Sequence, residues 1–335
     1  MTLDPFEKEQ RAAVRAVRDA ARVCRDVRRA LAPELSTTKA DQSPVTVADY
    51  ASQALISLAL ADAFPGDAVI GEETAAGMAG GSAELVRSVL EHVRSVRPEA
   101  DLDTVCRALD RCGDAGGPRG RRWTIDPVDG TKGFLRNQQY AVALALVRDG
   151  QVVLGVLGCP NLTVEPADPA SKVGAIFVAV RGGGAWQLPM DDDGELGGEA
   201  RRIHVSETTD FGEARYTESY ESEHSAQNLA EVIAAELGMA ADPLRIDSQA
   251  KYAVVARGQA EVYLRLPAGS YVEQVWDHAA GSIIVTEAGG CVSDVHGAPL
   301  DFSVGRRLER NRGVVAAPAA LHAKVVAVAA RVLGS

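Results

Sequence analysis

The sequence predicts a mixed α/β protein of two domains or two closely packed layers, with an antiparallel sheet. At 335 residues, of which 46% are hydrophobic, the chain is long enough to bury a sizeable core. Segments with helical spacing of apolar residues alternate with short apolar runs that are typical of strands. Two such runs, 140–147 and 152–157, flank Asp149-Gly150, and an Asp-Gly pair in that position indicates a β-hairpin. At least part of the sheet is therefore expected to be antiparallel.

Charge and cysteine content exclude several kinds of partner. The net charge of −11 argues against nucleic acid and anionic membrane surfaces, since both need basic patches. The five cysteines are odd in number and never spaced as a CxxC pair, which favours a reducing cytoplasm. Residues 1–10 carry three acids where a signal peptide would be basic and then apolar. We expect a cytoplasmic protein with neither nucleic acid nor membrane as partner, and the oligomeric state stays open.

Helices and one short strand are expected over the first 120 residues. The predicted helices cover 6–31, about 47–64, 83–96 and 102–112, and the predicted strand covers 68–70. A polar loop at 36–46 leads into the second helix, and Asp49 lies near the start of that helix, where the helix dipole alone could explain an acid. Glu72 follows the strand, and an acid at a strand end is a candidate metal ligand. The arginines of the loop at 113–122 are expected to be solvated.

An apolar strand that begins at Trp123 leads into the strongest candidate site. Pro127 is expected to end this strand, so that Asp126 and Asp129 lie on one tight bend and point at a common spot. Two converging carboxylates repel each other, and a hard cation relieves the repulsion. Oxygen ligands without a nearby Cys or His suit Mg²⁺, Mn²⁺ or Ca²⁺ rather than Zn²⁺. A surface turn rich in Asx residues is the alternative interpretation.

The second half of the chain is expected to contain both strands and helices. Strands are predicted at 175–181, 185–188, about 202–205, 261–266, 291–294 and 313–316, and helices at about 224–237, 248–256 and 319–333. An acidic, glycine-rich segment at 190–200 is the predicted seam, which gives domains of 1–200 and 201–335. Asp277 precedes an apolar helix that runs to Ala288, so it is either the N-cap of that helix or a ligand held there. Five candidate carboxylates thus lie at strand ends or helix starts: Asp49, Glu72, Asp126, Asp129 and Asp277.

Three segments carry a resemblance to a known family. Asp126 to Thr131 reads DPVDGT, Glu72 lies in the run GEE, and Asp277 lies in the run WDHAAG. This pattern resembles the signature of the lithium-sensitive, magnesium-dependent phosphomonoesterases related to inositol monophosphatase and fructose-1,6-bisphosphatase. Four further segments are similar to those of the 3′(2′),5′-bisphosphate nucleotidases: 45–50, 130–136, 247–252 and 262–267. The similarity extends over nearly the whole chain.

The resemblance implies a fold and an activity. The fold would be a layered αβαβα sandwich with mixed and antiparallel sheets, in which the site lies between two closely packed domains. The activity would be magnesium-dependent hydrolysis of the 3′-phosphate of adenosine 3′,5′-bisphosphate, and the sulfated nucleotide is a further expected substrate. An inositol phosphate or another small bisphosphate is the alternative substrate. A remote alternative is a sensor that binds Mg²⁺ and a nucleotide without turnover, which would not need Asp49 and Thr131.

The resemblance also implies residue roles. Two or three Mg²⁺ ions would be held by Glu72, Asp126, the carbonyl of Val128, Asp129 and Asp277, with Asp126 bridging. Asp49 and Thr131 would orient and deprotonate a metal-bound water for in-line attack. The rest of the phosphorylated small-molecule substrate would be bound by Thr131, His224, Ser225, Ser248, Lys251 and Arg265.

One segment departs from the nucleotidase pattern. The subfamily commonly has a His-Ser pair followed by a second His, but here His224-Ser225 is followed by Gln227 at that position. Glu223 also places a negative charge where a small residue is more usual. The chemistry is therefore more strongly implied than the choice of substrate.

Overall fold

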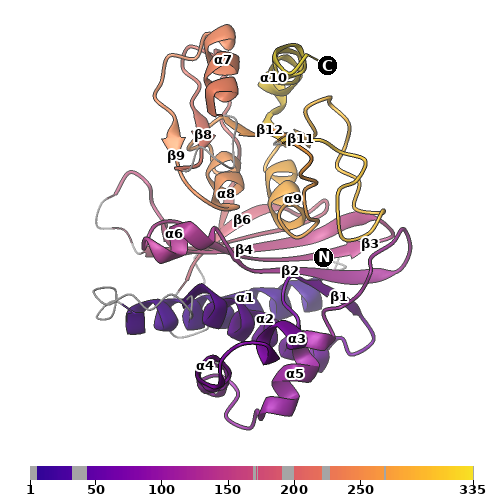
Figure 1. The fold of residues 1–335 in the computed structure, drawn as a ribbon. Coiled ribbons are helices and arrows are strands. Elements are labelled where there is room, and N and C mark those ends of the chain that lie inside the picture. The colour runs from indigo at the N-terminus through magenta and orange to yellow at the C-terminus, as the bar shows by residue number, and fades with distance from the viewer. Residues whose placement is uncertain are drawn as a thin grey trace.

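Two sheets of different size carry the fold, and layers of helices cover and separate them (Figure 1). The computed structural model describes residues 6–334, apart from 32–43, 169–170, 172, 191–199, 221–226 and 268. The larger sheet has the strand order β1 (Ala68–Gly71), β2 (Arg121–Asp129), β3 (Ala141–Arg148), β4 (Gln151–Thr163), β5 (Val173–Val180), β6 (Gly184–Pro189) and β7 (Arg201–Ile203). The smaller sheet has the order β11 (Gly290–Ser293), β12 (Val314–Pro318), β10 (Val262–Arg265), β8 (Tyr216–Glu218) and β9 (Leu244–Arg245).

The helices form three layers around these sheets. One outer layer contains α1 (Glu7–Leu31) and α2 (Pro44–Ala63), with α3 (Ala75–Ala79), α4 (Ala83–Arg94) and α5 (Leu102–Asp110) beside them. The middle layer contains α8 (Ala250–Ala256) and α9 (Ala279–Glu287), and the other outer layer contains α7 (Gln227–Leu237) and α10 (Ala319–Val332). The short helix α6 (Thr131–Leu135) follows β2. Since α1 packs on β4, α9 on both sheets and α10 on β12, the predicted αβαβα sandwich is confirmed.

The pairing of strands also agrees with the prediction of mixed and antiparallel sheets. In the larger sheet β1 pairs parallel with β2, and β2 to β7 form an antiparallel series that includes the predicted hairpin of β3 and β4. In the smaller sheet β10 pairs parallel with β8 and antiparallel with β12. The strand β7, which we expected to open the second half, pairs with β6 instead. The division at residue 200 stays a prediction, and the larger sheet extends past it to Ile203.

The expectation that β2 ends at Pro127 is wrong. The strand continues to Asp129, and its register against β3 shifts between Asp126 and Asp129. Proline fits such an irregularity because it has no N–H to donate to the neighbouring strand. Side chains three residues apart in a regular strand point to opposite faces of the sheet. The shift therefore changes which way Asp129 points relative to Asp126.

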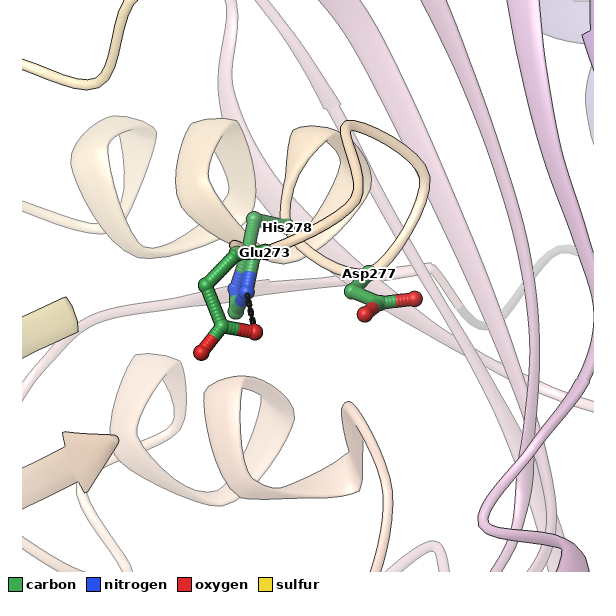
Figure 2. A group of neighbouring side chains, drawn as sticks. All are labelled: Glu273, Asp277 and His278. Atoms are coloured by element: carbon green, nitrogen blue, oxygen red, sulfur yellow. Dashed lines mark hydrogen bonds and ion pairs between the residues drawn. The ribbon is translucent and has the colours of Figure 1, made fainter. Parts of the chain in front are cut away.

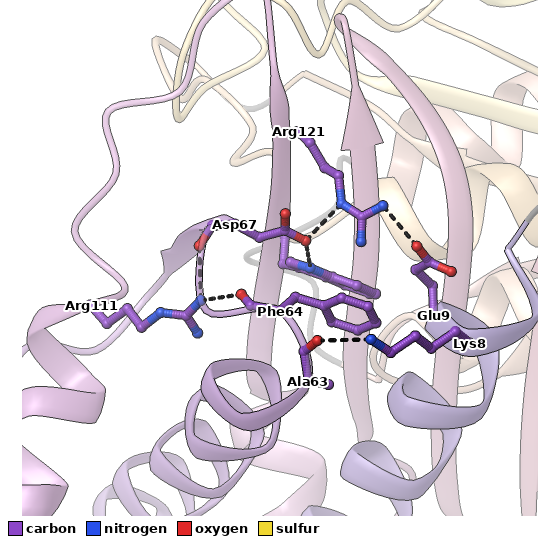
Figure 3. Close-up of polar contacts among 8 residues, drawn as sticks. Lys8, Glu9, Ala63, Phe64, Asp67, Arg111 and Arg121 are labelled. Carbon is purple, nitrogen blue, oxygen red and sulfur yellow. Dashed lines mark hydrogen bonds and ion pairs between the residues drawn. The ribbon is translucent and has the colours of Figure 1, made fainter.

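The start of β2 is joined to α1 and to the turn before β1 (Figure 3). Arg121 donates from Nε to Asp67 Oδ2 at 2.7 Å and from Nη1 to Glu9 Oε1 at 2.7 Å. Trp123 donates from Nε1 to the same oxygen of Asp67 at 2.8 Å, and its ring stacks on that of Phe64. We expected the arginines of this loop to be solvated, and this is wrong for Arg121, because its guanidinium is paired with two acids. Both acids come from distant segments, so the local sequence does not show the pairing. Among the described residues, no helix is both long enough and apolar enough to cross a bilayer.

Candidate functional site

One face of α2 holds two acid-bearing segments in place. Ser52 and Gln53 stand three and four residues after Asp49, so both share a face of the helix with it. Ser52 Oγ donates to the carbonyl of Pro127 at 3.1 Å. The amide of Gln53 donates to the carbonyl of Glu73 at 2.8 Å and accepts from the N–H of Glu73 at 2.9 Å. This helix thereby fixes both the turn after β1 and the end of β2 around the buried Asp49.

The helix dipole does not explain Asp49. The helix α2 begins at Pro44, three residues earlier than expected, and its first turn carries no acid. Asp49 is the sixth residue of the helix, and the dipole effect falls off within the first turn. Burial raises the pKa of Asp49 well above its usual value, and the charges of Glu73 and Glu72 raise it further.

A tight turn at Gly130 leads from β2 into α6. Gly130 has a φ of +85°, and a Cβ at this position would lie 2.7 Å from the Cβ of Ser248. Only glycine fits a left-handed conformation with so close a neighbour. Thr131 is the first residue of α6 and its side chain is exposed. The close approach places Ser248, itself at a φ of 70°, beside the turn that carries Thr131.

The structure brings the five predicted carboxylates together from four parts of the chain. They are Asp49 on α2, Glu72 after β1, Asp126 and Asp129 on β2, and Asp277 before α9. We call this group the carboxylate cluster. Burial raises the pKa of Asp126 well above its usual value, and the charges of the other four members raise it further. Within the described part of the chain, Asp126 Oδ1 is buried and has no hydrogen-bond partner. A buried acceptor without a partner is costly and suits a cation ligand.

Other members of the cluster also hold their protons more tightly than usual. Loss of solvent raises the pKa of Glu72 to about 7, with further contributions from Asp277 and Glu73. Burial raises the pKa of Asp277 to about 6, although the neighbouring His278 acts in the opposite direction. Burial also raises the pKa of Asp129, although the N–H of Gln249 donates to its Oδ2 at 2.6 Å. A set of crowded oxygen ligands without a thiol fits a hard divalent cation.

The alternative interpretation of Asp277 as a helix cap is wrong. The N-cap of α9 is His278, and its side chain makes no capping hydrogen bond. Asp277 is partly exposed, and the hydroxyl of Tyr271 donates to its Oδ2 at 3.5 Å. The Asp277 carboxylate is thus available to a ligand.

A second acidic group, Glu273, lies next to the cluster but is paired with Arg265 and His278 (Figure 2). Glu273 is buried, and it accepts from Arg265 Nε on one oxygen and from His278 Nε2 on the other, each at 3.2 Å. The hydroxyl of Tyr252 lies 2.8 Å from Nδ1 of the same histidine. Burial alone would raise the pKa of Glu273, but His278 and Arg265 lower it to about 2. Although Glu273, Asp277 and His278 offer ligand atoms within 4.8 Å of one another, the charge of Glu273 is already balanced.

The two predicted cations lie on neighbouring elements, Lys251 on α8 and Arg265 at the end of β10. Both charges act on Asp129 and lower its pKa, against the effect of burial. Lys251 is buried, and it donates to Ser219 Oγ at 2.9 Å and to the carbonyl of Ile246 at 3.2 Å. Burial lowers the pKa of Lys251 to about 8. The predicted contacts at His224 and Ser225, and the unusual Glu223, lie outside the described residues, and Gln227 is the first residue of α7.

Several residues near the site were not predicted. Glu273 stands four residues before Asp277. No local pattern marks it, because its partner Arg265 lies on a separate element, β10. Arg136 donates to Asp247 Oδ2 at 2.8 Å, and its guanidinium lies over the ring of Tyr220 at 5.9 Å. Tyr220 is 47% exposed, which leaves it accessible for stacking against a flat ligand. These contacts join segments that are far apart in the sequence.

Known proteins of similar sequence and structure match over nearly the whole chain. Residues 6–333 match the model of the inositol monophosphatase family. A 3′(2′),5′-bisphosphate nucleotidase of Oryza sativa is 44% identical over 333 residues, which cover 93% of this chain and 91% of that protein. A protein of the same name from Schizosaccharomyces pombe is 40% identical, with 98% and 96% covered. The solved structure of an inositol monophosphatase from Anabaena is similar at a TM-score of 0.63 and 19% identity, with 97% and 96% covered. This last likeness concerns the fold alone.

Proposed function

Because the chain belongs to the inositol monophosphatase family and, within it, to the 3′(2′),5′-bisphosphate nucleotidases, we propose that it hydrolyses the 3′-phosphate of adenosine 3′,5′-bisphosphate. The products are AMP and inorganic phosphate, and the sulfated nucleotide is a second substrate. The observation that carries this proposal is the carboxylate cluster with Lys251 and Arg265 beside it. The cluster suits the metal of a phosphatase, and the cations suit a second phosphate that this metal does not reach.

The cluster is the proposed site of two or three Mg²⁺ ions. Metal dependence is a property of the family, and the unpartnered Asp126 Oδ1 supports a cation here. The proposed ligands are Glu72, Asp126, the carbonyl of Val128, Asp129 and Asp277. When bound, the metal polarises the phosphoryl group and neutralises the charge that develops during its transfer.

Asp49 and Thr131 are the proposed catalytic residues. The Asp49 carboxylate accepts the proton of the attacking water, and its raised pKa makes it a stronger base than a solvated carboxylate. The exposed hydroxyl of Thr131 orients the water at the first turn of α6. The carbonyl of Pro127 is held by α2, so the base and the ligand-bearing strand keep a fixed spacing.

Other residues bind the remainder of the nucleotide. Arg265 and Lys251 meet the second phosphate, and Ser248 contributes its hydroxyl. The exposed ring of Tyr220, supported by Arg136, offers a surface for the adenine. His224 and Ser225 join this set on the strength of the resemblance.

Two earlier expectations stay part of this proposal. The first is the division into domains of 1–200 and 201–335, with the site between them. The second is a cytoplasmic location, which is supported by the free thiols of Cys24, Cys106, Cys112, Cys159 and Cys291.

Phosphate release from a panel of substrates tests the proposal. The panel contains adenosine 3′,5′-bisphosphate, the sulfated nucleotide, inositol 1,4-bisphosphate, inositol 1-phosphate and fructose 1,6-bisphosphate, each with Mg²⁺ and with EDTA. We expect the highest kcat/KM for the two nucleotides and no turnover in EDTA. A preference for an inositol phosphate would make the chain an inositol phosphatase of the same fold. Nucleotide binding without phosphate release would make it a sensor.

A further inference from the structure

A basic pocket lies at the C-terminal end of α1, apart from the carboxylate cluster. Its cavity volume is about 340 Å³, and none of the five carboxylates lines it. The polar side chains that line it are Arg25, Arg28, Arg29, Asn137, Tyr140 and Asn161. We call it the α1 pocket. A concentration of arginines is unexpected in a chain with a net charge of −11.

Three arginines of one helix face meet at the α1 pocket. Arg25, Arg28 and Arg29 stand at positions i, i+3 and i+4, so their charges lie side by side and repel each other. Arg25 is fixed in the wall, because its Nη2 donates to the carbonyls of Pro160 and Val173, each at 3.0 Å. Arg29 contacts Asp26 at 3.4 Å, but this pair is exposed and contributes little to balancing the charge.

The guanidinium of Arg28 contains a buried donor that has no acceptor among the described residues. Within the described part of the chain its Nε is buried and has no hydrogen-bond partner. A buried donor of a charged group costs free energy when it stays unpaired. Of the three arginines, only Arg28 has such a donor among the described residues, and Arg28 also lines the cavity.

Neutral donors complete the α1 pocket. Asn137 adopts a left-handed conformation, with a φ of 56°. The amide of Asn161 donates to the carbonyl of Gln138 at 2.5 Å, which fixes this side chain in the wall. Tyr140 is buried, and its ring packs edge to face with that of Phe134 on α6, with 5.0 Å between the ring centroids. The wall is therefore held by contacts to two neighbouring segments rather than by the arginines alone.

We propose that the α1 pocket is a second anion-binding site that takes a small molecule bearing a phosphate or sulfate group. A cavity of this volume admits such a group, and planar guanidinium groups bind its oxygens through charge-assisted hydrogen bonds. Tyr140 connects the pocket to α6, the helix that begins with Thr131. This proposal does not depend on the reaction of the carboxylate cluster.

The test uses the full chain in EDTA, so that binding of phosphate through metal at the carboxylate cluster is removed. Inorganic phosphate is titrated at constant ionic strength and followed by calorimetry. We expect saturable binding that Arg28→Gln weakens roughly tenfold or more, the loss of one charge-assisted hydrogen bond. Arg15→Gln is the matched control, since it removes the same charge from an exposed position of α1, and it should leave the affinity unchanged.

Further variants separate the alternatives. Because Arg265 is a proposed contact of a substrate phosphate, the titrations are repeated in an Arg265→Gln background, where Arg28→Gln should still weaken phosphate binding roughly tenfold or more. A loss of binding in Arg265→Gln without a loss in Arg28→Gln would place the anion beside the carboxylate cluster and overturn the proposal. Arg28→Lys keeps the charge and should retain part of the affinity, which guards against a folding defect in the Gln variant. Equal phosphate affinity in the wild type, Arg28→Gln and Arg15→Gln would show an adventitious ion only and would also overturn it.

Discussion

The carboxylate cluster lies beside Glu273 and its partners Arg265 and His278, which we call the Glu273 group, and the two regions behave in opposite ways. In the cluster, Asp126 is buried among four other acids, and its pKa is raised well above the usual value. Glu273 is buried to a similar degree, yet Arg265 and His278 lower its pKa to about 2. Burial is common to both regions, so the difference comes from the partners. An acid with its own cation serves the structure, and an acid without one is available to bind a cation from solution.

The largest effect is expected from removing one charge of the cluster. Asp126→Asn keeps the shape of the side chain but removes a ligand charge, and it should lower kcat/KM by at least about a hundredfold. The metal-free variant should be no less stable than the wild type, because repulsion between acids is reduced. Phosphate release and thermal unfolding in EDTA check both points. Activity within tenfold of the wild type would contradict the metal-site assignment.

Removing the acid of the Glu273 group should lower the free energy of unfolding. Glu273→Ala leaves Arg265 and His278 without their acid, and removing one partner of a buried pair costs about 3–5 kcal/mol of unfolding free energy. Glu236→Ala is the matched control, because its pair with Arg331 is exposed and is worth about 0–1 kcal/mol. Denaturant unfolding measures both changes. A loss in Glu273→Ala no larger than in the control would remove the distinction between the two regions.

Lys251 tests where the second phosphate binds. Lys251→Met keeps the apolar stem in its buried position but removes the charge, and it should lower kcat/KM for adenosine 3′,5′-bisphosphate roughly ten- to a hundredfold. Hydrolysis of 3′-AMP should change little, because that substrate has no 5′-phosphate. Parallel losses on both substrates would instead assign Lys251 to the catalytic centre or to the fold.

The two regions should also give opposite pH dependences of stability, which is the smallest effect. In EDTA, Glu72 and Asp277 have raised pKa values of about 7 and about 6, so their contribution is present at low pH and is lost as the pH rises to about 7. Glu273 has a lowered pKa of about 2, so its contribution is present above its ordinary value of 4.5 and is lost as the pH falls towards 2.

A pH series of melting temperatures checks these signs. Metal-free protein should melt at a lower temperature at neutral pH than at about pH 5. Mg²⁺ should remove this difference, because it binds the ionised carboxylates and stabilises the state that holds it. A metal-free melting temperature that rises between pH 5 and pH 7 would contradict the raised pKa values of the cluster.

The elements and the acids of the site were readable in the sequence. Helical spacing predicted α1, the Asp-Gly pair predicted the hairpin of β3 and β4, and strand ends or helix starts marked the five carboxylates. These signals are local, since they depend on the period of apolar residues and on the backbone preferences of Gly, Pro and Asp. The prediction that Pro127 ends the strand was wrong, because proline is also compatible with an extended strand where the pairing with the neighbouring strand is irregular.

Only the tertiary structure decided how those acids differ. The register shift in β2 depends on its pairing with β3, and the turn at Glu73 is held by Gln53 from a separate helix. The negative charge of Glu273 is balanced because Arg265, on a strand of the smaller sheet, donates a hydrogen bond to it. The sequence reports which residue types are present and how they are spaced along the chain. The charge balance of a buried acid depends on distances between segments, and folding alone sets those distances.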